Sequence, residues 1–148
     1  HLNFSNSKTV YYPRKHFDSI SPSVEFLEMH YADPSICNEV IAEVSGISTV
    51  YFRKLFTQHY GISPMRFVRQ KRINKARNLI ENGYTNITEI AESTGFNSIY
   101  HFSKAFKQIV GVSPANYAQA FVSGQFQPAD IAGQNRYPAS KNKNKELE

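Results

Sequence analysis

The sequence predicts an all-α fold in which two copies of a small helical unit are joined by one long helix. One observation is an internal repeat, because residues 46–64 and 95–114 share their glycine, aromatic, lysine and Ser-Pro positions. Another is that apolar residues recur three and four positions apart through most of the chain, which is the period of a helix with one buried face. A third is that glycine follows, and Ser-Pro precedes, several of these stretches, as is typical of helix ends and starts.

The two copies keep one register until a residue is gained. Tyr51 pairs with Tyr100 at an offset of 49 positions, and Phe52 pairs with Phe102 at an offset of 50. Aligning the two tyrosines makes His101 the inserted residue, at the early and exposed part of a helix. We therefore expect the two copies to present different surfaces to a partner.

Composition bounds the class of protein. The chain has 148 residues, 41% of them hydrophobic, so it can bury the core of one domain or of two small ones. A net charge of +5 suits an anionic partner, either nucleic acid or a membrane surface. Cys37 is the only cysteine, which excludes an internal disulfide and an all-cysteine zinc site and fits a cytoplasmic location. No apolar run approaches the roughly 18 residues of a membrane span, so no membrane partner is expected.

The chain begins with a stretch that precedes the repeat. Residues 1–20 are expected to be a linker or the remnant of an upstream domain, because polar and scattered apolar residues show no helical period. A helix is then expected over about 22–31, since a serine followed by proline is a typical helix start. Its apolar face consists of Val24, Leu27 and Tyr31, with Phe26 and Met29 at the margin.

The first copy of the unit contains two helices and a tight turn. The helix over about 36–44 has Ile36, Val40, Ile41 and Val44 as its apolar set. Gly46 follows where a turn needs a residue that tolerates positive φ. Ser48 or Thr49 caps the next helix, over about 49–60, and Gly61 ends it. The buried stripe of that helix is expected to be Phe52, Leu55 and Phe56.

The long helix between the copies is strongly basic. It is expected over about 64–82, and its buried face is Phe67, Val68, Ile73, Ala76, Leu79 and Ile80. Its other face is Arg66, Arg69, Lys71, Arg72, Lys75 and Arg77. Residues 49–77 contain eight Lys or Arg and no Asp or Glu, so the rest of the chain is net acidic. The basic face is compatible either with a solvated surface or with contacts to phosphate groups.

The second copy repeats the plan and leads into a polar tail. Helices are expected over about 87–94, 98–110 and 114–122, with a turn at Gly95 between the first two. Phe102 and Phe106 are expected in the core, and so are Tyr117 and Phe121. Residues 122–148 are rich in Gln, Pro, Asn, Lys and Ser, which favours a disordered tail.

Each copy has the features of a helix-turn-helix unit, in which the first helix braces a second that lies in the major groove of DNA. Ala42 and Ala91 allow the two helices to cross closely. The groove-facing candidates are polar or cationic: Thr49, Arg53, Lys54, Ser98, His101, Ser103, Lys104 and Lys107. A linker helix of about 18 residues is roughly 27 Å long, close to the ~34 Å turn of B-DNA. The two units could therefore read successive grooves of an asymmetric site without a dimer.

Two other classes of function compete with this interpretation. A helical scaffold for protein partners is the alternative, although solenoids usually need about three repeats to bury their faces. An enzyme is less compatible, since no Ser/His/Asp or phosphate-loop pattern is present. No second ligand lies at metal-site spacing from His59 or His101, so neither a metal nor another cofactor is expected. An alkylation-repair methyltransferase would need a cysteine cluster, which a single cysteine cannot supply.

Three motifs recur in the two copies: I-A-E-x-x-G-[IF] at 41–47 and 90–96, F-x-K-x-F at 52–56 and 102–106, and G-[IV]-S-P. Through these motifs, residues 21–121 resemble the DNA-binding domain of the AraC/XylS family of bacterial transcription regulators. The segment R-I-N-K-A-R-N-L-I at 72–80 matches the family's linking helix. The resemblance implies about seven helices, with subdomain one at about 21–63, a linker helix at about 64–82 and subdomain two at about 84–121.

The resemblance also implies which residues meet DNA. Recognition helices are expected at about 49–59 and 98–109. Base contacts are implied for Thr49, Val50, Arg53, Lys54, Ile99, Tyr100, His101, Ser103 and Lys104. Phosphate contacts are expected from Ser48, Arg66, Arg69, Ser98 and Lys107. Val50 and Ile99 depart from the usual polar readers, and each could contact a thymine methyl group or simply pack.

The implied partners extend beyond DNA. Family members usually carry a separate effector-binding or dimerisation domain, and residues 1–20 are too short to be one. RNA polymerase is a further expected partner, as for a transcription activator in the bacterial cytoplasm. Asn38 is a departure of another kind, because Ile87 takes the same, inner place in the second copy.

Overall fold

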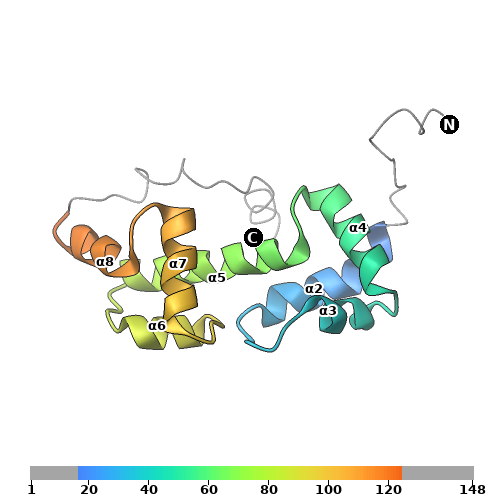
Figure 1. Ribbon diagram of the computed structural model, residues 1–148, viewed down its shortest axis with the longest axis horizontal. Coiled ribbons are helices and arrows are strands. Elements are labelled where there is room, and N and C mark those ends of the chain that lie inside the picture. Colours follow the sequence, from blue (N-terminus) through green and yellow to red (C-terminus); the bar gives the residue numbers. More distant parts are fainter. Residues whose placement is uncertain (1–16, 125–148) are drawn as a thin grey trace.

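The computed structural model describes residues 17–124, which form seven helices and no strand (Figure 1). The helices are α2 (Ser21–His30), α3 (Asn38–Val44), α4 (Thr49–Tyr60), α5 (Pro64–Glu81), α6 (Ile87–Ser93), α7 (Ile99–Val110) and α8 (Pro114–Val122). The predicted all-α fold is confirmed, and each helix end lies within two residues of its predicted position.

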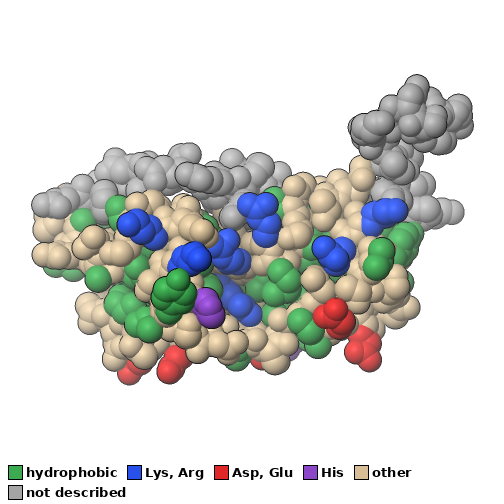
Figure 2. Space-filling view, in the orientation of Figure 1, with side chains coloured by type: hydrophobic (Ala, Val, Ile, Leu, Met, Phe, Trp, Pro, Cys, Tyr) green, Lys and Arg blue, Asp and Glu red, His purple; other side chains and the backbone are tan. Residues whose placement is uncertain are grey.

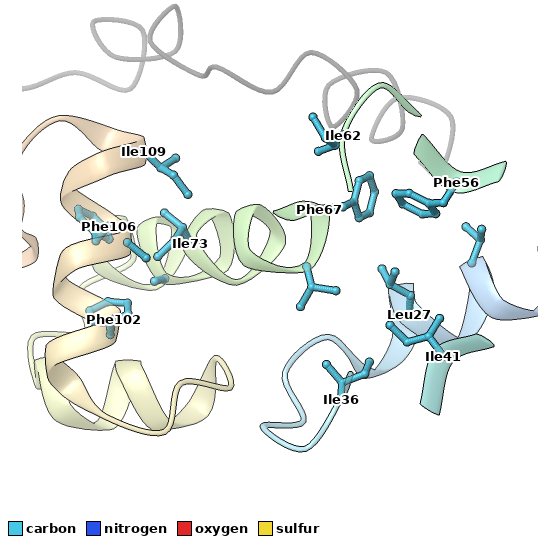
Figure 3. Close-up of a cluster of buried hydrophobic side chains, with 14 of the residues drawn as sticks. Leu27, Ile36, Ile41, Phe56, Ile62, Phe67, Ile73, Phe102, Phe106 and Ile109 are labelled. Carbon is cyan, nitrogen blue, oxygen red and sulfur yellow. The ribbon is translucent and has the colours of Figure 1, made fainter. Parts of the chain in front are cut away.

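Helix α5 is shared by two packed units, which lie at its two ends (Figure 1). We call α2–α4 with the first half of α5 the first unit, and α6–α8 with the second half of α5 the second unit. In the first unit the rings of Phe56 and Phe67 meet edge to face, with centroids 5.4 Å apart. In the second, Ile73 of α5 lies beside Phe106 and Ile109 of α7 (Figure 3). Side chains of α5 therefore complete the core of each unit.

Four helices begin with the same local device. A serine side chain accepts a hydrogen bond from the backbone N–H three residues ahead, which satisfies a donor that the first helical turn leaves unpaired. The serines are Ser48 for α4, Ser63 for α5, Ser98 for α7 and Ser113 for α8. Of the two predicted cap residues of α4, Ser48 and Thr49, Ser48 is the one that caps the helix. Gly61 and Gly111 then end α4 and α7 with φ of 84° and 106°, in the left-handed region.

These caps correct the position of the inserted residue. Ser48 and Ser98 occupy the same cap, so α4 and α7 pair at an offset of 50 along all 12 residues of each helix. The preceding turns still pair at 49, because Ile47 N–H and Phe96 N–H bond the equivalent carbonyls. The extra residue is therefore Asn97, in the turn, and the prediction that it is His101 is wrong. A turn can absorb a residue, whereas an insertion inside the helix would rotate every later side chain by one position.

Three apolar residues of the first unit are more exposed than predicted. Val40 and Val44 are 40% and 41% exposed, although both were expected inside, and Met29 is 76% exposed. Helix α3 is short and packs through Ile41 and Ala42, which are almost fully buried. With seven residues α3 makes fewer than two turns. It packs through one side only, so the flanking valines lie outward.

Two cations of the linker helix, Lys71 and Arg72, pack against the first unit, an arrangement that differs from both alternatives considered for the basic face, a solvated surface and phosphate contacts. The Nζ of Lys71 lies 2.7 Å from Glu28 Oε1 on α2, and the two side chains are only 16% and 15% exposed. Arg72 is half-buried and donates hydrogen bonds to backbone carbonyls of the loop between α2 and α3. These contacts hold α5 against the first unit.

The packed region starts before residue 21. Ile20 is fully buried, and the ring of Phe17 stacks on His59 near the end of α4 with centroids 3.8 Å apart. Residues 1–16 and 125–148 lie outside the described part of the chain, and so do most of the predicted linker and most of the predicted disordered tail. The domain limits of 21–121 thus stay a prediction.

A buried hydrogen bond fastens the last helix to α5. The hydroxyl of Tyr117 on α8 donates to Glu81 Oε2, and the tyrosine side chain is fully buried. Burial, assisted by this carboxylate acceptor, raises the pKa of the Tyr117 phenol above its usual value. The neutral phenol is therefore the form that the fold stabilises.

We expect Tyr117→Phe to lower the free energy of unfolding by about 1–3 kcal/mol, because Glu81 loses a buried donor to its carboxylate. Urea denaturation followed by circular dichroism measures the change. Tyr84→Phe is the matched control, since Tyr84 is 58% exposed, and it should stay within about 0.5 kcal/mol of the parent. Equal stability of the two variants would contradict the role of the Tyr117 hydroxyl.

Candidate nucleic-acid interface

Helix α4 has one buried and one exposed side. The buried side consists of Phe52, Leu55 and Phe56, each at most 1% exposed. The other side carries the predicted base-contacting residues of the first unit: Thr49, Val50, Arg53 and Lys54. Val50 is 70% exposed, Arg53 and Lys54 are exposed, and Thr49 is half-buried. An exposed valine beside two cations is a surface that can meet both an apolar and a polar base edge.

Helix α7 presents the equivalent surface of the second unit. Phe102, Ala105, Phe106, Ile109 and Val110 are buried. The predicted readers lie on the opposite side: Ile99, Tyr100, His101, Ser103 and Lys104. Tyr100 is 66% and Ile99 45% exposed, His101 and Lys104 are exposed, and Ser103 is half-buried. At equal positions, Arg53 of α4 is replaced by Ser103 and Tyr51 by His101, so the two surfaces differ chemically without any shift in helix register.

The cap of α7 also orients a predicted reader. Ser98 Oγ accepts the backbone N–H of His101 and lies 3.1 Å from Nδ1 of the same residue. Which atom of this pair donates depends on the tautomer of the ring. When the hydroxyl donates to Nδ1, the neutral His101 ring carries its proton on Nε2, so its outer edge offers an N–H donor to a partner.

Charge is separated across the molecule. In Figure 2, Lys and Arg side chains form a band over α7, α5 and α4, whereas Asp and Glu lie along the opposite edge of the view. Exposed acidic residues occur on the supporting helices, namely Glu39 and Glu43 on α3 and Glu89 and Glu92 on α6. The recognition helices themselves carry no Asp or Glu. A polyanion is therefore attracted to the side of α4 and α7 and repelled from the side of α3 and α6.

The predicted phosphate contacts fall into three groups. Ser48 and Ser98 cap their helices with the side-chain oxygen, so they could meet a phosphate only alongside that role. Arg66 and Lys107 are exposed. Arg69 is half-buried, and its Nη2 donates to Gln108 Oε1 on α7. Sequence reasoning missed Gln108 as a partner of Arg69, because a contact between residues 39 positions apart leaves no local pattern.

Within residues 17–124, no group of three or more His, Cys, Asp or Glu side chains could hold a metal ion. No helix in the described part of the chain is long and apolar enough to cross a membrane.

Comparison with known proteins agrees with this arrangement. A family model described as a helix-turn-helix domain matches residues 41–120, which is more than half of the chain. The transcriptional activator RhaS of Salmonella schwarzengrund is 34% identical over 94 residues, or 64% of this chain and 34% of RhaS. The chain thus spans about a third of the length of the curated relatives it matches.

Two solved structures share the fold. A probable AraC family transcriptional regulator from Rhodopseudomonas palustris is 29% identical with a TM-score of 0.62, covering 70% of this chain and 97% of that one. The DNA-binding domain of AdpA, solved in complex with a target DNA, is 23% identical with a TM-score of 0.67, covering 72% of this chain and 96% of that one.

Two helix-turn-helix units on one shared helix, with basic recognition helices, define a class of DNA-binding domain found in transcription regulators. Within that class, the chain belongs to the AraC/XylS family. The family resemblance seen in the sequence is confirmed.

The exposure of Tyr100 separates a reading position from a packing position on the same helix. Tyr100→Ala should leave the free energy of unfolding within about 0.5 kcal/mol of the parent, because the ring is mostly exposed. Phe102→Ala should cost about 3–5 kcal/mol, because the ring fills the second core. Thermal or urea unfolding compares the two. A large loss for Tyr100→Ala would mean that the tyrosine supports the fold.

Proposed function

We propose that residues 21–121 bind duplex DNA with the exposed sides of α4 and α7 in successive major grooves. The observation that carries this proposal is the structural equivalence of the two helices, which have the same length, the same serine cap and the same glycine end. Helix α4 lies at one end of α5, and α7 crosses the second half of α5 (Figure 1). The AdpA domain of the same fold, crystallised with a target DNA, supports a role in duplex binding.

The length of α5 supports the spacing. Its 18 residues rise by about 27 Å, with α4 beyond its first end and α7 crossing its second half (Figure 1). Major-groove contacts on one face of B-DNA recur every ~34 Å. One chain can therefore reach two half-sites about one turn apart.

The chemistry of the exposed sides suggests a division of labour. Arg53, Lys54 and Lys104 can donate to guanine O6 and N7, and the outer N–H of His101 can do the same. Val50 and Ile99 suit a thymine methyl group, and Tyr100 presents a large ring next to Ile99. Thr49 and Ser103 can donate to or accept from either purine edge. The half-sites should therefore differ in sequence, because the two sets of side chains differ.

Phosphate groups would be held by the flanking residues. The proposed contacts are Ser48, Arg66, Arg69, Ser98 and Lys107. Arg66 and Lys107 are exposed and can approach a phosphate directly. Arg69 still has guanidinium donors beyond the one directed at Gln108, so it can bridge α7 and the DNA backbone.

We further infer that the chain is the DNA-binding part of a larger regulator. The effector or dimerisation domain would lie elsewhere in that protein, and RNA polymerase would be a partner of the bound complex. The name of the RhaS relatives favours activation of transcription in the bacterial cytoplasm. The chain would act by binding and not by catalysis.

Selection of bound duplexes from a random pool tests the two-helix proposal. We expect a bipartite, asymmetric motif whose half-sites lie about 10–11 base pairs apart, because each recognition helix occupies one groove. A single short motif without a second half-site would show that only one helix reads bases.

Arg53→Ala and Lys104→Ala should each reduce the preference for the selected duplex over a random one by roughly 5-fold to 150-fold, equal to about 1–3 kcal/mol. Fluorescence anisotropy with both duplexes measures the ratio at fixed salt. Lys75→Ala is the control, since Lys75 is an exposed cation of α5 outside both recognition helices. It should leave the ratio unchanged. A preserved preference in both reader variants would remove these two assignments.

A further inference from the structure

A half-buried arginine lies where the two units meet. Arg72 is on α5, and its Nε donates to the carbonyl oxygen of Tyr31 at 2.6 Å, while its Nη2 donates to the carbonyl oxygen of Asp33 at 3.0 Å. Both carbonyls belong to the loop that follows α2 in the first unit. Unpaired carbonyls gather at the C-terminus of a helix, so a cation there is favourable. Arg72 thus fixes this loop to the linker helix.

The same guanidinium also faces the second unit. Its Cζ lies 5.6 Å from the ring centroid of Phe96, and Phe96 follows Gly95 in the turn between α6 and α7. A Cβ on Gly95 would lie 2.7 Å from Arg72 Nε and 2.9 Å from the carbonyl oxygen of Ala32. The turn therefore packs against both the arginine and the loop, with no room for a methyl group. Gly46, at the same place in the first unit, has no atom within 4 Å of such a Cβ.

The contacts of Arg72 with the two carbonyls and with the Phe96 ring require properties that only arginine combines. The planar guanidinium can donate to two carbonyls in different directions and stack on a ring at the same time, whereas lysine offers one compact charge. Burial lowers the pKa of Arg72, and the Asp33 carboxylate opposes this effect. The cost of burying the charge is offset by hydrogen bonds to the two carbonyls.

We propose that Arg72 is a positioning residue that locks the two recognition helices in one relative orientation and so restricts the protein to DNA sites with one half-site spacing. This inference rests on the proposed binding to successive grooves. Two linked binding elements gain from each other only when their geometry allows both to engage. One added base pair moves the second half-site by about 3.4 Å and turns it by about 34° around the duplex. A rigid junction cannot follow that change, whereas a loosened junction can.

The test compares the selected duplex with a duplex that carries one extra base pair between the half-sites. The parent should lose at least about tenfold in affinity on the lengthened duplex, because one recognition helix leaves its groove. Arg72→Lys keeps the charge, and Arg72→Met keeps an unbranched apolar side chain without the charge. For both variants we expect a loss of less than about threefold, because the second unit can turn to follow its half-site. Affinity for a duplex with a single half-site should stay at the parent value in Arg72→Lys.

Gly95→Ala and Gly46→Ala form a matched pair for the same assay. Both place a side chain at positive φ in a helix-turn-helix turn, but only Gly95→Ala would force atoms against Arg72 and Ala32. Gly95→Ala should reduce the spacing penalty, and Gly46→Ala should keep it. Arg72→Lys and Gly95→Ala decide the question if Arg72→Met unfolds.

A distance measurement tests the junction without DNA. Spin labels are attached through Lys54→Cys and Lys104→Cys, on the exposed sides of α4 and α7, in a chain that also carries Cys37→Ser. The parent should give one narrow distance distribution, and Arg72→Lys a broader one. Lys75→Met, an exposed change on the same helix, should leave it narrow.

The outcomes separate the two proposals. A spacing penalty that is unchanged in Arg72→Lys and Gly95→Ala, with an unchanged distance distribution, overturns the role of Arg72 and leaves the two-groove function standing. A parent protein that shows no spacing penalty but binds the duplex with a single half-site more weakly overturns the rigid junction and leaves the two-groove function standing. A parent protein that binds the selected, the lengthened and the single-half-site duplexes equally removes the two-groove function, and the restriction on half-site spacing is lost with it.

Discussion

Burial on both ends of one helix is the constraint on which the whole molecule depends. Small domains bury a low fraction of their surface, so each three-helix unit gains stability by packing on α5. Helix α5 supplies Phe67 and Val68 to one core and Ile73, Ala76 and Ile80 to the other. The same helix therefore stabilises both units and sets their separation. Residues that fill the two cores also determine how far apart the reading surfaces lie.

Much of the fold could be predicted from the sequence because its signals are local. A serine before a helix and a glycine after it are read from neighbouring residues, and these fixed the limits of α4, α5, α7 and α8. The position of Asn97 could not be found in this way, since aligning identical tyrosines ignores the cap that sets the helix register. Lys71 and Arg72 were also misplaced, because their partners Glu28, Tyr31 and Asp33 are distant in sequence.

The candidate interface also has features that local sequence patterns predict and features that they do not. Helical spacing was enough to predict that Arg53, Lys54 and Lys104 lie on the exposed side. The pairing of Arg69 with Gln108 and the orientation of His101 by Ser98 depend on side-chain geometry, which spacing does not specify. The base sequence of the binding site is harder still to predict from the protein sequence, because each side chain can pair with more than one base edge.

The turn that holds Asn97 has a consequence for how such proteins can change. Because the length difference between the units is confined to this turn, α4 and α7 are interchangeable in length, cap and end. A recognition helix could be transplanted from one unit to the other as a cassette of 12 residues, with its buried side adjusted to the new core. Each recognition helix can therefore change its half-site preference independently of the other. The shared helix α5 keeps the order and the spacing of the two half-sites.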